Sequence, residues 1–311
     1  ASELAQATWL EFLAIHIPGS AKSPGSQVMM SPPLAAPQPK PRDTLPAVVG
    51  AYVAFACIAV VVFHGVAECQ VSAIVTVSAV VQCLGIALLC IKVLSSGNAA
   101  GISAGSLKLD AIAMGFRLSS TMIYDGYLPV DASGDFVYQA IEVCSVLMVI
   151  WLLRRVLVVH RDTYQASEDT VGIVTMTLVS LGLAALLHAD MNGSHVFDTL
   201  WMAGLFAGVM AVMPQLWLIM QSGGSAQALT GHYIAALALS RVLNGIYMWM
   251  AREDLTSNEW IVPGFNHAVW AILVAQLVHL LLIGDFAYHY VLALLRRGLS
   301  EPIELGGELW V

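Results

Sequence analysis

The chain has 311 residues, of which 58% are hydrophobic and only 11% charged, and its mean hydropathy of +0.77 exceeds that of soluble domains. These values indicate an integral membrane protein. A formal net charge of -8 with only 13 Lys and Arg residues excludes the broad basic surface that nucleic-acid binding requires, so no nucleic-acid partner is expected.

Residues 1–45 differ from the rest of the chain and are interpreted as an amino-terminal arm. Repeated prolines from Pro18 onward, including Pro32 and Pro33, favour an extended chain over a helix. Ahead of them, an apolar stretch with Trp9 and Phe12 predicts a short amphipathic helix. We expect these residues to bind a partner protein, with a disordered tail as the alternative. The first residue is an alanine, which would suit a trimmed presequence.

Eight apolar segments follow, each close to the roughly 20 residues that cross a bilayer. We expect an all-α polytopic membrane protein with one extra amino-terminal transmembrane helix over 46–67, a seven-helix domain over 71–299 and an acidic tail over 300–311. The seven helices of the domain are predicted to begin near Val71, Leu107, Phe136, Val171, Val196, Gly231 and Val262.

The positions of basic residues agree with this count, because loops on the cytosolic, matrix or stromal side of a membrane collect Lys and Arg. With eight spans, ten basic residues fall on one side and only Arg252 on the other. Both termini are therefore expected on the positive side. The two basic residues that remain, Arg117 and Arg241, fall within predicted helices.

A weak internal repeat surrounds these two arginines. A helix that ends in Ser95-Ser96-Gly97 precedes the helix of Arg117, and a helix that ends in Ser222-Gly223-Gly224 precedes the helix of Arg241. The repeat predicts two parallel three-helix units joined by a linker helix, which is one plan of membrane transporters and receptors.

An arginine within the membrane needs a partner or water, because its insertion costs about 2.5–3.5 kcal/mol. One interpretation is that Arg117 and Arg241 line a central cavity and bind an anionic group such as a carboxylate. The other is that they pair with Glu142 or Asp285 and hold the helices together. The residues leave both interpretations open.

Other site chemistry is not expected. The five cysteines and the scattered histidines lack the spacing of a metal site, and no motif of a nucleotide-binding or hydrolytic enzyme is present. We therefore predict a protein that is not an enzyme and has no cofactor. Bound lipid is expected, and a pigment is expected only within a photosynthetic complex.

The stretch from Val71 to Leu299 carries a series of short motifs. They are Ala100-Gly101-Ile102-Ser103, Arg117, Thr163-Tyr164, Asp169-Thr170, Leu200-Trp201, Met213-Pro214-Gln215-Leu216, His232-Tyr233, Arg241, Asp285-Phe286, Tyr288 and Tyr290. With these motifs the stretch resembles a known family, the KDEL receptors (ER lumen protein retaining receptors), which share a fold with SWEET and PQ-loop transporters. The resemblance implies that Arg117, Arg241 and Trp201 stand at ligand positions.

Other family positions differ in this chain. By the resemblance, Gln82 replaces the histidine that senses pH, Val75 replaces an arginine, and Gly208 replaces an acid on the fifth helix of the family. Ser120 and Ser240 replace a further acid and a tyrosine. The family's lysine-rich tail is replaced by an acidic one. The resemblance therefore implies a peptide-carboxylate pocket that has lost several of its residues.

We accordingly predict a non-catalytic accessory subunit of a larger organellar membrane complex, respiratory or photosynthetic, which contacts other membrane subunits through its arm and its lipid-facing helices. The first alternative is a divergent receptor of the ER and Golgi membranes that binds C-terminal KDEL-like or HDEL-like signals. The second is a transporter of small solutes similar to SWEET proteins.

Overall fold

A computed structural model describes residues 45–66, 73–124, 136–189, 194–222, 225–253, 265–297 and 303–304. The chain divides into the units Ala1–Lys40 and Pro41–Val311, and all described residues belong to the second. The arm residues Trp9, Phe12, Pro32 and Pro33 lie outside the described residues, so the prediction that they bind a partner stays a prediction.

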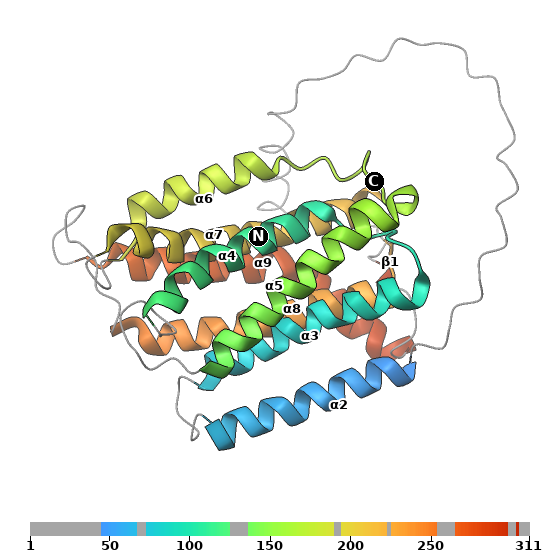
Figure 1. The fold of residues 1–311 in the computed structure, drawn as a ribbon, viewed down its shortest axis with the longest axis horizontal. Coiled ribbons are helices and arrows are strands. Elements are labelled where there is room, and N and C mark those ends of the chain that lie inside the picture. Colours follow the sequence, from blue (N-terminus) through green and yellow to red (C-terminus); the bar gives the residue numbers. More distant parts are fainter. Residues whose placement is uncertain are drawn as a thin grey trace, which may run out of the picture. The chain divides into compact units, whose positions relative to one another are not determined.

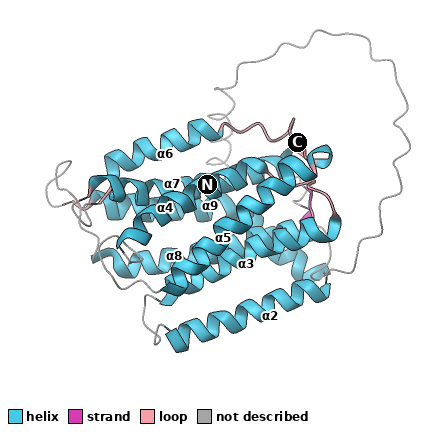
Figure 2. Ribbon diagram, viewed as in Figure 1, coloured by secondary structure: helices cyan, strands magenta, loops and turns pink. Residues whose placement is uncertain are grey.

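The described residues form eight α-helices (Figures 1 and 2). The first, α2, is continued by a π-helical turn, Val62–Val66, and α5 by another, Arg155–Val159. Short 3-10 turns lie at Arg161–Thr163 and Ala251–Glu253. The eight helices are α2 (Leu45–Val61), α3 (Ala73–Ser96), α4 (Ala104–Tyr124), α5 (Phe136–Arg154), α6 (Ile173–Leu187), α7 (His195–Gln221), α8 (Ala228–Met250) and α9 (His267–Arg297).

The predicted extra helix and the seven that follow it are thus confirmed as helices. Five of them, α2, α3, α5, α7 and α9, are long and apolar enough to span a membrane. Among the other three, α6 has only 15 residues, and α4 and α8 carry Arg117 and Arg241 with further polar residues. The protein is therefore an all-helical membrane protein, while the full count of eight spans stays a prediction.

Packing between the helices is reciprocal (Figure 1). Helix α3 packs chiefly against α8, and α7 packs chiefly against α4. Helix α5 lies against α3 and α4, and α9 lies against α7 and α8. If α3–α5 and α7–α9 are equivalent units, the first helix of each unit packs against the second helix of the other: α3 against α8, and α7 against α4. This symmetric packing is compatible with the predicted repeat with α6 as the linker, and the repeat stays a prediction.

Helix α2 lies at the edge of the bundle against α3. Its Tyr52 hydroxyl lies 3.1 Å from Nδ1 of His232 on α8, and the Tyr290 hydroxyl of α9 lies 2.6 Å from the same nitrogen. The rest of α2 is largely exposed and apolar, with Val53 at 58% exposure. Such a surface suits contact with lipid, since few polar groups on it need water.

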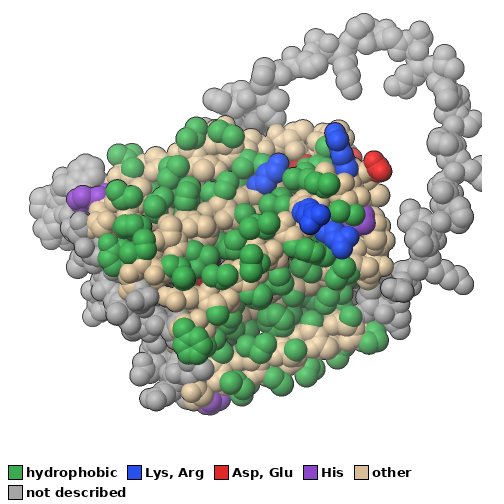
Figure 3. Space-filling view, in the orientation of Figure 1, with side chains coloured by type: hydrophobic (Ala, Val, Ile, Leu, Met, Phe, Trp, Pro, Cys, Tyr) green, Lys and Arg blue, Asp and Glu red, His purple; other side chains and the backbone are tan. Residues whose placement is uncertain are grey.

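The outer surface of the bundle is mostly apolar, as Figure 3 shows for one face. Exposed residues such as Leu147, Val174 and Leu281 contribute to it. At one end of the helices, a two-stranded antiparallel pair joins β1 (Ser225–Ala226) to β2 (Ile303–Glu304), with Ser225 opposite Glu304. This pairing connects the loop before α8 to the chain that follows α9.

Candidate functional site

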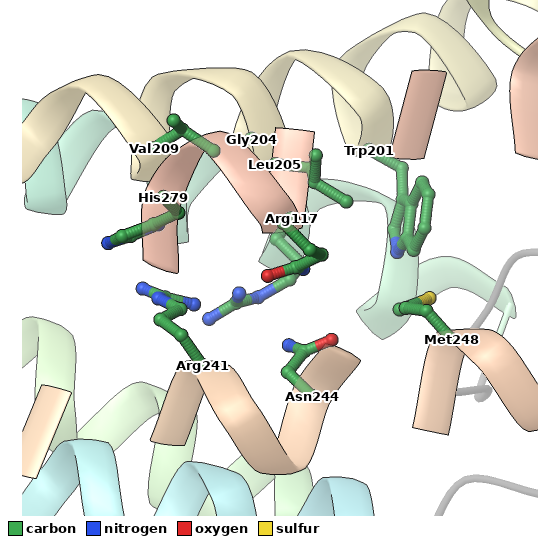
Figure 4. A pocket seen from close by; sticks show the side chains of 10 residues that line it. Arg117, Trp201, Gly204, Leu205, Val209, Arg241, Asn244, Met248 and His279 are labelled. Atoms are coloured by element: carbon green, nitrogen blue, oxygen red, sulfur yellow. The ribbon is translucent and has the colours of Figure 1, made fainter. Parts of the chain in front are cut away.

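A small cavity lies between α4, α7, α8 and α9 (Figure 4). Its enclosed space is about 20 Å³, room for about one water molecule. Both predicted arginines face it, together with Trp201. Its lining consists of Arg117, Trp201, Gly204, Leu205, Val209, Arg241, Asn244, Met248, Gln276 and His279.

Arg117 is neutralised within the protein. Its Nε donates to Oε2 of Glu142 at 3.0 Å, and its Nη2 donates to Oε1 at 2.5 Å. The Glu142 side chain is only 2% exposed, so this bidentate ion pair joins α4 to α5 in a buried place. Of the two predicted acidic partners, Glu142 is therefore the one that pairs with Arg117.

The close approach of α7 to α4 depends on Gly204. A Cβ atom at this position would lie 2.8 Å from the Ala113 carbonyl oxygen and 3.1 Å from the Arg117 backbone nitrogen. The first distance is shorter than real Cβ atoms show, and its partner is a backbone atom, so only glycine lets the two helices meet here. This contact brings Trp201 and Val209 of α7 to the same cavity as Arg117.

Arg241 differs from Arg117. Its side chain is 7% exposed, its Nε has no hydrogen-bond partner, and no carboxylate in the described part of the chain lies within 4.0 Å of its guanidinium. A Cβ built on Gly208 would lie 3.8 Å from its Nη2. Gly208 thus occupies the place from which a side chain of α7 would meet this guanidinium.

Four further polar atoms of the lining are buried without a hydrogen-bond partner among the described residues. They are Nε1 of Trp201, Oδ1 of Asn244, Oε1 of Gln276 and Nε2 of His279. Buried polar groups normally have partners. The cavity therefore presents unpaired donors and unpaired acceptors around one guanidinium, which is the character of a polar ligand site.

The structure separates two predicted residues from this cavity. Asp285 is 49% exposed and lies 3.8 Å from His289 one turn along α9, so the prediction that it pairs with an intramembrane arginine is wrong. Gln82 is buried on α3, where its Nε2 donates to the Met114 sulfur at 3.2 Å, and it does not line the cavity.

Several motif residues instead form a hydrogen-bonded cluster at the loop between α3 and α4, here called the loop cluster. Asp169 accepts bonds from the Ser103 hydroxyl at 2.8 Å, the Gly105 backbone N–H at 3.0 Å and the Tyr164 hydroxyl at 2.7 Å. Burial and the bond to Asp169 raise the pKa of Tyr164.

Gln215 of α7 completes the loop cluster. Its Oε1 accepts the Ser103 backbone N–H at 2.9 Å, and its Nε2 donates to the Gly101 carbonyl oxygen at 3.0 Å. Gly101 has a φ of +71°, a conformation that favours glycine. These motif residues therefore fix the loop rather than line the cavity.

Sequence reasoning missed Asn244, Gln276 and His279, although a signal was present. Asn244 lies three residues after Arg241, and His279 lies three residues after Gln276, so each pair shares a helix face. It also missed Asp110, a buried acid on α4 whose Oδ2 accepts the Tyr233 hydroxyl at 3.0 Å. Polar residues three apart in apolar helices indicate an interior face.

Comparison with known proteins shows a family resemblance. Residues 98–252 match the family model of the ER lumen protein retaining receptor. This match begins in the loop between α3 and α4 and extends through α8, and so includes both arginines, the loop cluster and Trp201.

Curated relatives cover more of the chain. The ER lumen protein-retaining receptor erd-2.2 of Caenorhabditis elegans is 28% identical over 223 residues, 71% of this chain and 94% of the relative. Receptor A of Arabidopsis thaliana is 24% identical over 213 residues, with 68% and 89% covered. Receptor 2 of Xenopus laevis is 26% identical over 219 residues, with 70% and 92% covered.

These relatives are receptors, in agreement with the prediction that the chain is not an enzyme. They support the receptor interpretation better than an organellar accessory subunit. The matched helices, the cavity between them and the similarity to whole receptors lead to one conclusion: the chain belongs to the ER lumen protein retaining receptor family, as a distant member.

Proposed function

We propose that the protein is a retrieval receptor that binds the C-terminal carboxylate of an ER lumen protein in the cavity around Arg241. The observation that carries this proposal is the buried Arg241 guanidinium, which has no carboxylate partner in the described part of the chain. A cation in such a place is costly unless an anion joins it. The receptor names of the relatives support the same role.

The other cavity residues suit a peptide rather than a simple inorganic anion. A peptide carries backbone N–H donors next to its terminal carboxylate. The unpaired oxygens of Asn244 and Gln276 accept such donors, while Arg241 and the Trp201 N–H donate to the carboxylate oxygens. A neutral sugar would leave the guanidinium without a counter-charge, which makes a sugar transporter less compatible with this lining.

The cavity must widen before a peptide enters, because its present space of about 20 Å³ holds about one water molecule. Helices α7 and α8 carry Trp201, Leu205 and Met248 on the walls, and movement of these side chains would enlarge it. We therefore expect ligand binding to be accompanied by a movement of the side chains of α7 and α8 that face the cavity.

Binding of a synthetic peptide to the full chain in lipid nanodiscs tests the proposal. The probe is a peptide that ends in Lys-Asp-Glu-Leu with a free carboxylate, and the matched ligand is the same peptide with a C-terminal amide. We expect the free acid to bind and the amide to bind at least about tenfold more weakly, since a charge-assisted pair contributes about 1.5–3 kcal/mol.

The matched protein variants are Arg241→Gln, which removes the charge from the cavity, and Arg252→Gln, which removes a charge outside it. We expect Arg241→Gln to abolish the preference for the free acid and Arg252→Gln to retain it. Equal affinity for acid and amide, or no binding of either, would refute the proposal.

A further inference from the structure

We propose that Arg154, Arg155 and Arg161, together with Lys108, bind the headgroup of an anionic phospholipid, and that the preferred headgroup is a phosphoinositide with a monoester phosphate. These four residues are here called the basic patch. The inference goes beyond the proposed function and does not rest on it, because none of the four residues lines the cavity around Arg241.

The basic patch lies where α5 ends and α4 begins. Arg154 is the last residue of α5, Arg155 begins the π-helical turn that follows, and Arg161 begins the next 3-10 turn. Lys108 lies near the start of α4, which packs against α5. Arg154, Arg161 and Lys108 are exposed, and Figure 3 shows Lys and Arg side chains gathered toward one end of this face.

The charges of the basic patch are not neutralised by the part of the chain that the structure describes. No carboxylate oxygen there lies within 4.0 Å of a side-chain nitrogen of the four residues. Glu168, which follows Arg161 in the same loop, instead accepts bonds from the side chains of Gln165 and Ser222. Like charges without a counter-charge repel one another, so a ligand with several negative charges is favoured here.

Apolar residues before and after Arg154 indicate that the patch lies at a membrane surface. Helix α5 with its π-helical turn, Phe136–Val159, is one of the candidate membrane spans. Ile150, one turn before Arg154, is 54% exposed, and Val158, one turn after it, is 70% exposed. Exposed apolar side chains on a span suit contact with lipid. Lipid is therefore a better occupant than a soluble protein, since the Arg154 side chain can extend along this surface to the headgroups.

The contact between Arg155 and Trp151 points to the same level of the membrane. The guanidinium carbon lies 5.0 Å from the centroid of the Trp151 ring, a cation–π contact. Tryptophan is enriched at the headgroup level. Guanidinium groups bind phosphate oxygens in pairs, and a monoester phosphate offers three oxygens and a charge of about -1.5 to -2 at neutral pH. Several arginines therefore match this group better than the single charge of a phosphodiester.

Binding of short-chain lipids to the full chain in detergent micelles tests the inference. The probe is dioctanoyl phosphatidylinositol 4-phosphate, and the matched lipid is dioctanoyl phosphatidylinositol, which lacks the monoester phosphate. We expect the phosphorylated lipid to bind at least about tenfold more tightly. Its affinity should fall as the salt concentration rises, because the patch is exposed and its charges are screened.

Variants assign the binding to the patch. Arg154→Gln, Arg155→Gln and Arg161→Gln should each weaken binding of the phosphorylated lipid about fivefold. The matched control is Arg252→Gln, which should keep the native affinity. Arg252 also lies over a tryptophan ring, 4.9 Å from the centroid of Trp249, but it is predicted to lie on the opposite side of the membrane.

Lysine variants at the same three positions guard against a change of orientation. They keep the positive charge that sets the orientation of the chain in the membrane, but they lack the planar group that binds two phosphate oxygens. We expect their affinity for the phosphorylated lipid to lie between those of the native protein and the glutamine variants.

Equal affinity for the two lipids, or native affinity in all of the glutamine and lysine variants, would overturn the inference. An oligoglutamate peptide that binds more tightly than the phosphorylated lipid would overturn it in favour of an acidic protein partner. Neither result would change peptide binding in the cavity around Arg241, so the proposed function would stand.

Discussion

Substitution of Gly208 by glutamate should close the anion site from within the protein. The added Cβ would lie 3.8 Å from the Arg241 Nη2 and 4.0 Å from the Ala113 Cβ, which are ordinary contacts, so position 208 accepts a side chain. A carboxylate there would reach the unpaired guanidinium and form an ion pair resembling that of Arg117 with Glu142.

The magnitude follows from the competition between two carboxylates for one guanidinium. A hydrogen-bonded charge pair contributes about 1.5–3 kcal/mol. A ligand that must displace an internal carboxylate therefore loses about 10- to 150-fold in affinity. Thermal stability of the empty protein should not fall, because the new pair neutralises a buried charge that now has no partner.

The assay compares peptide affinity and melting temperature for Gly208→Glu, Gly208→Gln and Gly208→Ala in nanodiscs. Gly208→Gln controls for the volume of the side chain, and Gly208→Ala controls for loss of the glycine. We expect only the glutamate variant to lose affinity by the full factor. If the glutamine variant loses as much, crowding and not charge is responsible, and the reasoning about an unpaired Arg241 is refuted.

Three further changes test the structural framework. Glu142→Gln should destabilise the protein by about 3–5 kcal/mol by leaving Arg117 buried without its partner, and a thermal-shift assay showing an unchanged melting temperature would contradict the buried pair. Asp169→Asn should lower the melting temperature, because Asp169 holds the loop cluster together. Peptide affinity should change by no more than twofold to threefold, about 0.5 kcal/mol. Loss of peptide binding without a change in stability would show that the loop belongs to the binding site. Tyr52→Phe should cost about 1 kcal/mol and increase proteolysis near α2, and unchanged proteolysis would show that the contact with His232 does not hold that helix.

Sequence reasoning predicted the helices well, because hydropathy and the positions of Lys and Arg report directly on contact with lipid and with water. It could not decide how many helices span the membrane. Helices α4 and α8 are polar because they carry the interior groups of the site, and α6 is short, so these three differ from the pattern of a simple span.

The candidate site was predictable only in part. Both arginines and Trp201 were identified, but Glu142 and Asp285 were equally acceptable partners in the sequence. The choice between them depends on how α5 and α9 are placed against the arginine-bearing helices, and packing determines that placement. Asp285 lies on an exposed part of α9, whereas Glu142 faces Arg117.

The central claim is that Arg241 has no carboxylate partner of its own and binds the carboxylate of the ligand. A double-mutant cycle tests this claim most directly. The free-acid and amide peptides are each measured against the native protein and against Arg241→Gln, so that the coupling between the two charges is isolated. The account predicts a coupling of about 1.5–3 kcal/mol, because the carboxylate and the guanidinium form a charge-assisted hydrogen bond with each other in this cavity. A coupling near zero would show that Arg241 does not contact the ligand carboxylate, and would contradict the account.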